Sequence, residues 1–403
     1  MSKGAGSPQS KGKKRNSIVM LLSNPATFDQ RPLKEAHALS EAGWSVTILA
    51  WDRELEAPAV SVFDDGLVIK RFRLRAGHGT PLLTVPRLLL FYAWCSVNLI
   101  FKQTDAIHCH DVDTLPPGFV GILARRGIPK LVYDMHDLPE AFLRFFPLTR
   151  YTQAVFLASA RRLASAIIVV NDRFVPYLGD LGFDETKLVV VMNSPSAEMG
   201  RGAKARGDLF NVLYYGWLGE ERGVKLLTEA VQGLDKVTLS LAGRGELEGM
   251  VREAAARNPS IKFLGWLNMR DLEKAISEAD LIPSLYEPRT KNAMLATPGK
   301  LLTAMSLSVP SLVPKGTYQA EIVEKYRCGM VVDWSDVEDV RRAVTMLATD
   351  AGLYSRLAES SYAAFQSFFS WEVMRNRLVE MYSRLAGAEN RKPERVLVSG
   401  PKL

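Results

Sequence analysis

Short apolar segments alternate with longer helical ones along almost all of the 403-residue chain, and this alternation constrains its fold most strongly. Ser17–Leu22 is apolar, residues 31–42 repeat apolar side chains at helical spacing, and Ser45–Leu49 is apolar again. Continuous apolar strands joined by helices form parallel sheets that are covered on both faces. The sequence therefore predicts a doubly wound α/β fold.

The alternation occurs in two series, separated by the Gly-, Arg- and Lys-rich segment 200–207. Further strands of the first series are predicted at 67–71, 106–110, 130–134, 166–170 and 188–192, with helices at 88–101, 116–126 and 151–164. Strands of the second are predicted at 211–215, 237–242, 261–264, 281–282, 310–313 and 330–332, with helices at 223–232, 246–257, 269–278, 298–307, 319–325 and 336–348. We expect two Rossmann-like domains, 16–199 and 208–370, facing across a cleft, with ligands beyond the carboxyl ends of the strands.

The net charge of +7 is concentrated at the two ends of the chain. Residues 1–15 contain five lysines and arginines and no acidic residue, and residues 391–403 contain four against one glutamate. The remainder is close to neutral, so no basic face for nucleic acid is predicted. We interpret both ends as disordered solubilising tails, with weak attraction to an anionic surface as the alternative.

Cysteine usage and the lack of a targeting pattern favour the cytoplasm. Cys95, Cys109 and Cys328 are far apart and have apolar neighbours, which indicates neither a disulfide framework nor a C-x-x-C metal site. No signal-peptide pattern follows the basic first segment. The longest apolar stretch, 88–101, has 14 residues and falls short of the roughly 18 that a spanning helix needs. We expect a cytoplasmic protein, with the inner face of the membrane as a further location.

Three of the five histidines lie in or just after two predicted strands of the first domain. His110 and Asp111 end the strand 106–110, and His136 follows the strand 130–134. These positions favour a functional site, and histidine changes its protonation near neutral pH. Buried structural histidines and helix-capping aspartates are the alternative interpretation. The spacing is unfavourable for zinc, and no metal site is predicted.

Glycines beside arginines follow two predicted strands of the second domain. Gly216-Trp217-Leu-Gly-Glu-Glu-Arg222-Gly223 follows the strand 211–215, and Gly243-Arg244-Gly245-Glu246 follows the strand 237–242. A cation near a helix N-terminus suits a diphosphate, whereas glycines alone also form tight turns. No G-x-G-x-x-G follows the first strand of the chain, so an ordinary dinucleotide fingerprint is absent.

The order and spacing of several motifs over residues 17 to about 388 resemble the family-4 retaining glycosyltransferases. These motifs are Asp29-x-Arg31-x-x-Lys34-Glu35-Ala36, Gly43-Trp44-Ser45, His108-x-His110-Asp111, Tyr133-Asp134-x-His136-Asp137, Asn193-Ser194-Pro195, Gly216 to Gly223, Gly243-Arg244-Gly245-Glu246, Phe263-Leu264-Gly265, Pro298-Gly299-Lys300-Leu301 and Phe369-Ser370-Trp371. Each motif is weak alone, but the ordered set is specific.

The resemblance implies a GT-B fold with an acceptor-side first domain, a second domain that binds a nucleotide sugar, and a final helix, 371–390, that returns to the first domain. It implies retaining transfer of a hexosyl group from a nucleoside-diphosphate sugar to a glycan or lipid-linked acceptor, without a metal or other cofactor. Cations and helix N-termini would stabilise the departing diphosphate. The implied site residues are His110, Asp111 and His136 for catalysis, Gly216, Trp217, Arg222, Arg244, Glu287, Lys300 and Thr303 for the donor, and Asn24, Asp29 and Arg31 for the acceptor.

Two of these positions depart from the family's pattern. Trp217 stands where an arginine is usual, and Thr303 stands where the second of two glutamates is usual. Glu287 supplies the first glutamate if residues 289–296 are a local insertion. The departures keep open a degenerate GT-B protein that binds a nucleotide sugar or a partner without transfer. A nucleotide-sugar epimerase on the same fold is a second alternative.

Two apolar segments of the first domain bear on membrane contact. Residues 88–101 are apolar nearly all round, which is typical of a buried helix. Phe142–Pro147 places three phenylalanines beside Arg144 in a predicted loop, where a cation favours anionic headgroups. We therefore expect weak contact with a membrane surface through this loop and not through the helix.

Overall fold

The computed structural model describes residues 16–27, 30–76, 81–126, 129–138, 147–197 and 207–387. Residues 1–15, most of the predicted linker, the loop 142–146 and residues 391–403 lie outside the described residues. By their contacts, the described residues divide into two units. The first unit lies within Met1–Met135, Arg150–Ile167 and Leu378–Arg391, and the second within His136–Thr149, Ile168–Arg377 and Lys392–Leu403. The domain limits expected from the sequence stay predictions.

An eight-stranded sheet with the strand order β3-β4-β2-β1-β5-β6-β7-β8 makes up most of the first unit, while the contacts assign its last strand, β8, to the second unit. Its strands are β1 Ser17–Leu22, β2 Ser45–Asp52, β3 Val60–Val62, β4 Val68–Arg73, β5 Ala106–His110, β6 Lys130–Met135, β7 Ala166–Val169 and β8 Leu188–Val190. β1 pairs in parallel with β2 and β5, as expected for helical crossovers, whereas the short edge strand β3 is antiparallel to β4.

Helices connect these strands: α1 Gln30–Glu41, α2 Pro81–Phe101, α3 Leu115–Ala124, α4 Pro147–Leu163 and α5 Phe174–Asp180. Alternation along β5 assigns its side chains to the two faces of the sheet. Cys109 faces α3 so closely that a Cβ atom added at Gly118 would lie 2.4 Å from its sulfur. His108 and His110 point to the opposite face, where α1 and the final helix α14, Trp371–Leu385, contribute side chains.

The second unit contains a parallel sheet of β9 Phe210–Trp217, β10 Val237–Arg244 and β11 Ile261–Gly265, and a parallel pair of β12 Ser311–Pro314 and β13 Gly329–Val332. The extended segment 281–284 joins the two sheets. Leu281 forms a bridge with Val212 of β9, and the Ser284 amide donates to the Leu312 carbonyl of β12 at 2.8 Å. The strand predicted at 281–282 is therefore reduced to this bridge.

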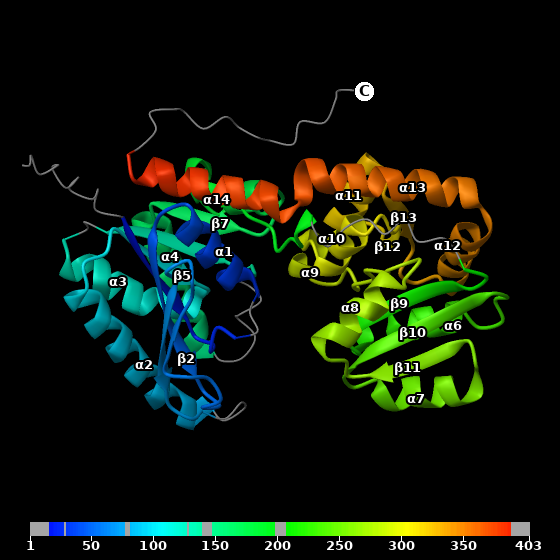
Figure 1. The fold of residues 1–403 in the computed structure, drawn as a ribbon, viewed down its shortest axis with the longest axis horizontal. Helices are drawn as coiled ribbons and strands as arrows, with labels where there is room; N and C mark the ends of the chain where they lie inside the picture. The colour runs from blue at the N-terminus through cyan, green and yellow to red at the C-terminus, as the bar shows by residue number, and fades with distance from the viewer. Residues whose placement is uncertain are drawn as a thin grey trace, which may run out of the picture. The chain divides into compact units, whose positions relative to one another are not determined.

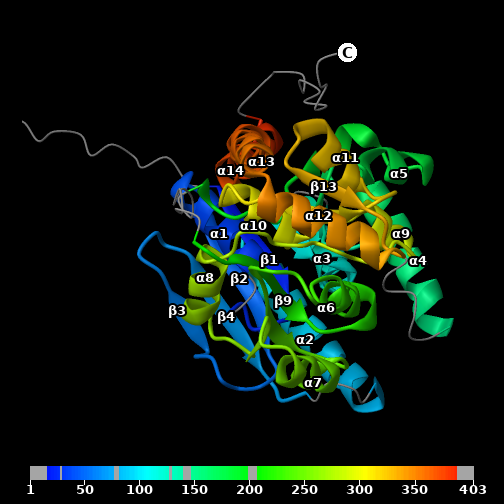
Figure 2. The ribbon, with the colours of Figure 1, turned by 90° about the vertical axis from the view of Figure 1, so that its right-hand side faces the viewer.

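Helices of the second unit are α6 Val224–Ala230, α7 Glu248–Arg257, α8 Met269–Ser277, α9 Lys291–Leu295, α10 Gly299–Ser306, α11 Tyr318–Tyr326, α12 Val337–Thr349 and α13 Ala351–Ala364. α7 packs against β10 and β11 (Figure 1), and α11 and α12 contact β13 (Figure 2). The buried core includes Val212, Leu239 and Leu312, one from each of three strands. Two Rossmann-like α/β units result, which confirms the predicted fold class.

One prediction of burial is wrong. α2 begins at Pro81, before the predicted start, and only one of its faces packs on the sheet, through Phe91, Cys95 and Leu99. Its other face leaves large apolar side chains exposed, including Leu89 at 60% and Phe101 at 82%. A helix with apolar side chains on all its faces is therefore not necessarily buried on all of them. No helix in the described part of the chain is long and apolar enough to span a membrane.

Candidate functional site

A buried cluster of charged and imidazole side chains lies where α1, β5 and β6 meet in the first unit. Arg31 and Glu35 are one turn apart on α1, and the Arg31 Nε lies 3.0 Å from a Glu35 carboxylate oxygen. The Arg31 Nη2 also lies 2.5 Å from Oδ1 of Asp134 on β6. The other Asp134 oxygen lies 3.1 Å from Nδ1 of His110 on β5. One carboxylate thus contacts both a guanidinium and an imidazole in a nearly water-free environment.

His108 and Tyr382 extend this cluster. The rings of His108 and His110 stack with their centroids 4.3 Å apart, as expected for residues i and i+2 on one face of a strand. The Tyr382 hydroxyl on α14 lies 3.0 Å from Nδ1 of His108. Burial raises the pKa of Tyr382 well above its usual value, and the Glu35 carboxylate raises it further. Tyr382 therefore stays a phenol that helps to orient the His108 ring.

The side chains of this cluster include the kinds of ligand atoms that a metal site contains. Ligand atoms of Glu35, His108, His110 and Asp134 all lie within 4.8 Å of one another, and two imidazoles with two carboxylates suit zinc or a similar ion. Arg31, however, already pairs with both carboxylates. Burial opposes its charge, but Asp134 and Glu35 outweigh burial and raise the pKa of the guanidinium. The cluster therefore contains a resident cation, and independence from metal remains a proposal.

Asp111 terminates β5 in an unusual backbone conformation, with φ 63° and ψ 166°. Its amide donates to the Asp134 carbonyl at 2.9 Å, and the Thr114 hydroxyl donates to the His110 carbonyl at 2.7 Å. These bonds fix the end of the strand beside the imidazole of His110. A non-glycine residue at positive φ costs free energy and is concentrated at functional sites.

The other residues expected in the first domain are placed differently. His136 directly follows β6 and is half-buried, but the contacts assign it to the second unit. The Asn24 Oδ1 accepts from the Ala26 amide at 2.9 Å, so this side chain shapes the loop after β1. Arg31 is 4% exposed within the cluster, and Asp29 lies outside the described residues. The catalytic and acceptor roles of these residues remain predictions.

Lys300 forms the centre of a second site, in the second unit. It is the second residue of α10, and its side chain is buried against the rings of Tyr214, Tyr215 and Tyr286, at 5.0, 5.4 and 5.4 Å from the ammonium. Burial lowers the pKa of Lys300 to about 8, with a smaller contribution from Arg222. Among the described residues, no carboxylate forms an ion pair with this ammonium.

Arg222 adds a second cation to this site. It ends the short 3₁₀ turn Glu220–Arg222 after β9, and its guanidinium lies 4.3 Å from the Tyr286 ring centroid. Its Nε pairs with the Glu221 carboxylate at 2.8 Å. The pKa of Lys300 falls partly because of Arg222, so the two cations are close enough to repel each other. An anion between them would relieve that repulsion.

Glycines keep the end of β9 open to this ammonium. A Cβ at Gly216, where φ is +122°, would lie 3.3 Å from the Lys300 Nζ. A Cβ at Gly243, which is paired with Gly216 in β10, would lie 1.8 Å from the Gly216 carbonyl oxygen. Side chains are thus excluded, and backbone is exposed beside a buried cation.

The remaining donor-site predictions fall at the edges of this site. Trp217 is 48% exposed and pairs in register with Arg244, whose guanidinium lies 4.6 Å from the centroid of the exposed Trp266 ring. The Glu287 carboxylate pairs with Arg289 at 2.6 Å. Thr303 hydrogen-bonds the Tyr215 side chain, whose pKa is raised by burial to about 12. The donor roles remain predictions for all of these residues.

Several residues of the two sites were not among those predicted. They are Glu35, His108, Asp134 and Tyr382 in the first unit, and Tyr214, Tyr215 and Tyr286 in the second. The sequence contained a signal for Glu35, because it comes four residues after Arg31 and therefore lies on the same helix face. Alternation from His110 would have identified His108 in the same way. Tyr382 is 274 residues from its partner and had no local signal.

Two protein families match this chain, one in each half of the sequence. The family described as "Glycosyl transferase 4-like domain" matches residues 30–194, and the family described as "Glycosyl transferases group 1" matches residues 210–350. Together they cover most of the chain, in the order that the motifs implied. The chain therefore carries a glycosyl transferase 4-like domain followed by a group 1 glycosyl transferase domain. The resemblance to glycosyltransferases found in the sequence is confirmed, and retention of configuration stays a prediction.

A curated relative of this chain is the "GDP-mannose-dependent monoacylated alpha-(1-6)-phosphatidylinositol monomannoside mannosyltransferase" of Corynebacterium glutamicum. It is 25% identical over 167 residues, which are 40% of this chain. The match spans only 43% of the relative's own length.

Solved structures of low sequence identity share the fold of this chain. Sucrose-phosphate synthase from Thermosynechococcus elongatus superimposes with a TM-score of 0.72 at 18% identity, covering 93% of this chain and 100% of the other. HepE from Anabaena in complex with UDP gives 0.67 at 18% identity, covering 91% and 100%. At these identities the likeness shows the GT-B fold alone.

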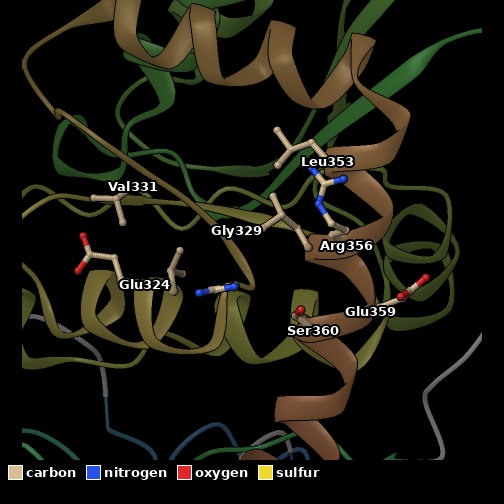
Figure 3. A pocket seen from close by; sticks show the side chains of 10 residues that line it. Glu324, Gly329, Val331, Leu353, Arg356, Glu359 and Ser360 are labelled. Atoms are coloured by element: carbon tan, nitrogen blue, oxygen red, sulfur yellow. The ribbon is translucent and has the colours of Figure 1, made fainter. Parts of the chain in front are cut away.

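A separate hollow in the second unit lies among α11, β13 and α13 (Figure 3). Its volume is about 500 Å³, and its lining includes Glu324, Arg327, Arg356 and Glu359. None of the residues of the Lys300 site lines it. Its charged lining contains both signs and therefore favours neither anions nor cations.

Proposed function

We propose that this chain transfers a hexosyl group from a nucleoside-diphosphate sugar to a glycan or lipid-linked acceptor, with retention of the anomeric configuration. The observation that carries the proposal is the buried Lys300 ammonium beside Arg222, at the glycine-lined end of β9. A buried cation costs free energy unless an anion compensates it. A diphosphate at this site would provide that compensation.

The arrangement of the second unit suits the departure of a diphosphate. As the glycosidic bond breaks, negative charge grows on the phosphate oxygen that leaves the sugar. Lys300 and Arg222 are held by packing before the reaction and need little reorganisation to stabilise that charge. Lys300 also lies in the first turn of α10, where the helix dipole and free backbone amides favour an anion. No metal is required by this scheme.

In the first unit, His110 is the residue proposed to contact the transferred sugar. Asp134 and the stacked His108 restrict the orientation of its ring. A hydrogen-bonding group held in a fixed position can bind the sugar more tightly in the transition state, when its charge and shape have changed, than in the ground state. Asp111, at the end of the same strand, and His136, after β6, are proposed to share this role, with Asn24, Asp29 and Arg31 on the acceptor side.

The acceptor proposal receives support from the Corynebacterium relative, whose name includes a monoacylated phosphatidylinositol monomannoside. A lipid-linked acceptor would require the enzyme to work at a membrane surface. We propose the inner face of the cytoplasmic membrane as that surface.

The test is a donor screen with purified chain, in which release of the nucleoside diphosphate is measured with and without acceptor extracts. The proposal expects acceptor-dependent release, and proton coupling constants of the product should show the donor's anomeric configuration. Lys300→Met should abolish release, whereas Lys315→Met, an exposed lysine of the same unit, should leave it unchanged. Binding without release would indicate a degenerate protein, and an isomerised donor without acceptor would indicate an epimerase.

A further inference from the structure

The outward face of α2 is apolar although it faces solvent. Positions Val85, Leu89, Ala93, Val97 and Phe101 follow one another at helical spacing and are all exposed. Their large members range from 52% to 82% exposed. A helix that covers one face of a sheet normally presents charged and polar side chains to water. This stripe contains none.

α3 extends this surface next to α2 (Figure 1). A Cβ at Gly121 of α3 would lie 3.0 Å from Leu99 of α2, so the glycine allows the two helices to approach closely. Val120 and Leu123 of α3 are 40% and 71% exposed. We call the exposed apolar residues of α2 and α3 the α2–α3 face.

Within α2, α3 and the residues just after them, the charged side chains have one sign. Residues 81–103 and 115–126, which contain both helices and the residues just after them, include four cations and no aspartate or glutamate. The cations are Arg87, Lys102, Arg125 and Arg126. Arg125 donates to the carbonyls of Leu99 and Ile100, which fixes it where the two helices end together. An apolar surface with basic edges complements an anionic bilayer.

We propose that the α2–α3 face docks on an anionic phospholipid surface. Its apolar side chains enter the headgroup region, and the neighbouring Arg87, Arg125 and Arg126 contact lipid phosphates. Docking is a property of the first unit and does not require transfer, but it would bring the proposed lipid-linked acceptor to the enzyme. The loop that the sequence analysis expected to make this contact lies outside the described residues apart from Pro147, and its prediction stays untested.

The charge pattern disfavours a second copy of the chain as the occupant. A twofold contact would place the same patch against itself, so the cations of one copy would face those of the other. Like charges brought together in this way oppose association. Lipid phosphates supply the opposite charge.

Flotation of the full chain with vesicles tests the proposal. Wild type should float with vesicles containing about one third phosphatidylglycerol and much less with pure phosphatidylcholine. Leu89→Ser/Val97→Ser should lower partitioning at least about tenfold, because two exposed apolar contacts are lost. Leu209→Ser/Met346→Ser removes two exposed apolar side chains of the second unit and should float like wild type. All of these proteins contain the same basic residues 1–15, whose contribution cancels.

Three results would overturn the proposal. Wild type could stay at the bottom with both vesicles, or the Leu89/Val97 variant could float as well as wild type. Alternatively, sedimentation could show a dimer that the Leu89/Val97 variant converts to monomer, which would assign the face to self-association. Circular dichroism and nucleoside-diphosphate binding of each variant separate loss of docking from loss of folding or of the donor site.

Discussion

Nδ1 of His110 lies 3.1 Å from Oδ2 of Asp134, across the neighbouring strands β5 and β6. Both side chains are buried, and the same carboxylate also pairs with Arg31. Removing its charge would leave the buried Arg31 guanidinium with Glu35 as its remaining ion-pair partner among the described residues. This one carboxylate therefore supports the local fold as well as the orientation of the imidazole.

Asp134→Asn should destabilise the first unit by about 3 to 5 kcal/mol, the usual cost of removing one partner of a buried ion pair. Amide hydrogen exchange in β5 and β6 measures the local free energy of opening. The matched control is Asp65→Asn, which removes the partner of the half-exposed His37 and should cost less than about 1 kcal/mol. Equal protection of the β5 and β6 amides from exchange in both variants would contradict the role of Asp134 in stabilising the first unit.

His110→Ala should lower kcat by about a hundredfold and change donor affinity little, because an interaction made in the transition state affects turnover more than ground-state binding. Initial rates and calorimetric binding of the nucleoside diphosphate measure the two quantities. His37→Ala, which lies outside the cluster, should retain both. A variant of His110 with normal kcat would make the residue structural.

Nucleoside-diphosphate affinity should fall as pH rises above about 8. Lys300 has a pKa of about 8 in the free protein, and bound diphosphate would raise it, so binding above this pH requires uptake of a proton. Titration calorimetry from about pH 7 to about pH 9 should show an affinity that approaches a tenfold decrease per pH unit. Lys300→Arg keeps its charge throughout and should remove the pH dependence. A flat wild-type profile would refute the role of Lys300.

Lys300→Met should stabilise the second unit at pH 7 while abolishing diphosphate binding. A lysine pKa lowered from 10.5 to about 8 means that the unfolded chain binds more protons between these values, so wild-type stability rises with pH across this range. At pH 7 the buried charge therefore costs about 1 to 3 kcal/mol, after some compensation by the tyrosine rings. Urea unfolding should show a gain that shrinks above pH 8. A loss of stability at pH 7 would contradict this.

Chelation should leave turnover unchanged. Arg31 pairs with both carboxylates of the buried cluster, so no divalent ion is needed to compensate them. Activity assays with and without EDTA, together with elemental analysis of the purified protein, measure this. Loss of activity on chelation, restored by one added metal, would assign the ion to Glu35, His108, His110 and Asp134 instead.

Much of the fold follows from local patterns in the sequence. The strands at Ser17–Leu22 and Ala106–His110 were predicted at their observed limits because each is a continuous apolar run between helical segments. α13 was missed, although the Asp350 side chain caps it by accepting from the Leu353 amide. That aspartate directly follows α12, so the signal that starts the next helix coincides with the end of the previous one.

The sites were predictable where a motif marks the end of a strand, as for His110, or the start of a helix, as for Lys300. The tyrosines around Lys300 were not predictable in the same way, because Tyr286 belongs to an irregular segment with no periodicity. Whether α2 is buried or exposed also could not be read from hydropathy. An apolar stripe looks the same in sequence whether it faces β-strands or solvent.

The contact between Gly216 and Gly243 restricts how this chain can change during evolution. Any side chain at position 243 would collide with the backbone at position 216, and a side chain at 216 would press on Lys300. At position 243 no side-chain rearrangement can relieve this collision, and at position 216 the φ of +122° disfavours any side chain even if Lys300 moves away. Variation in donor preference should arise through side chains around this point, such as Trp217 and Thr303, while the two glycines persist.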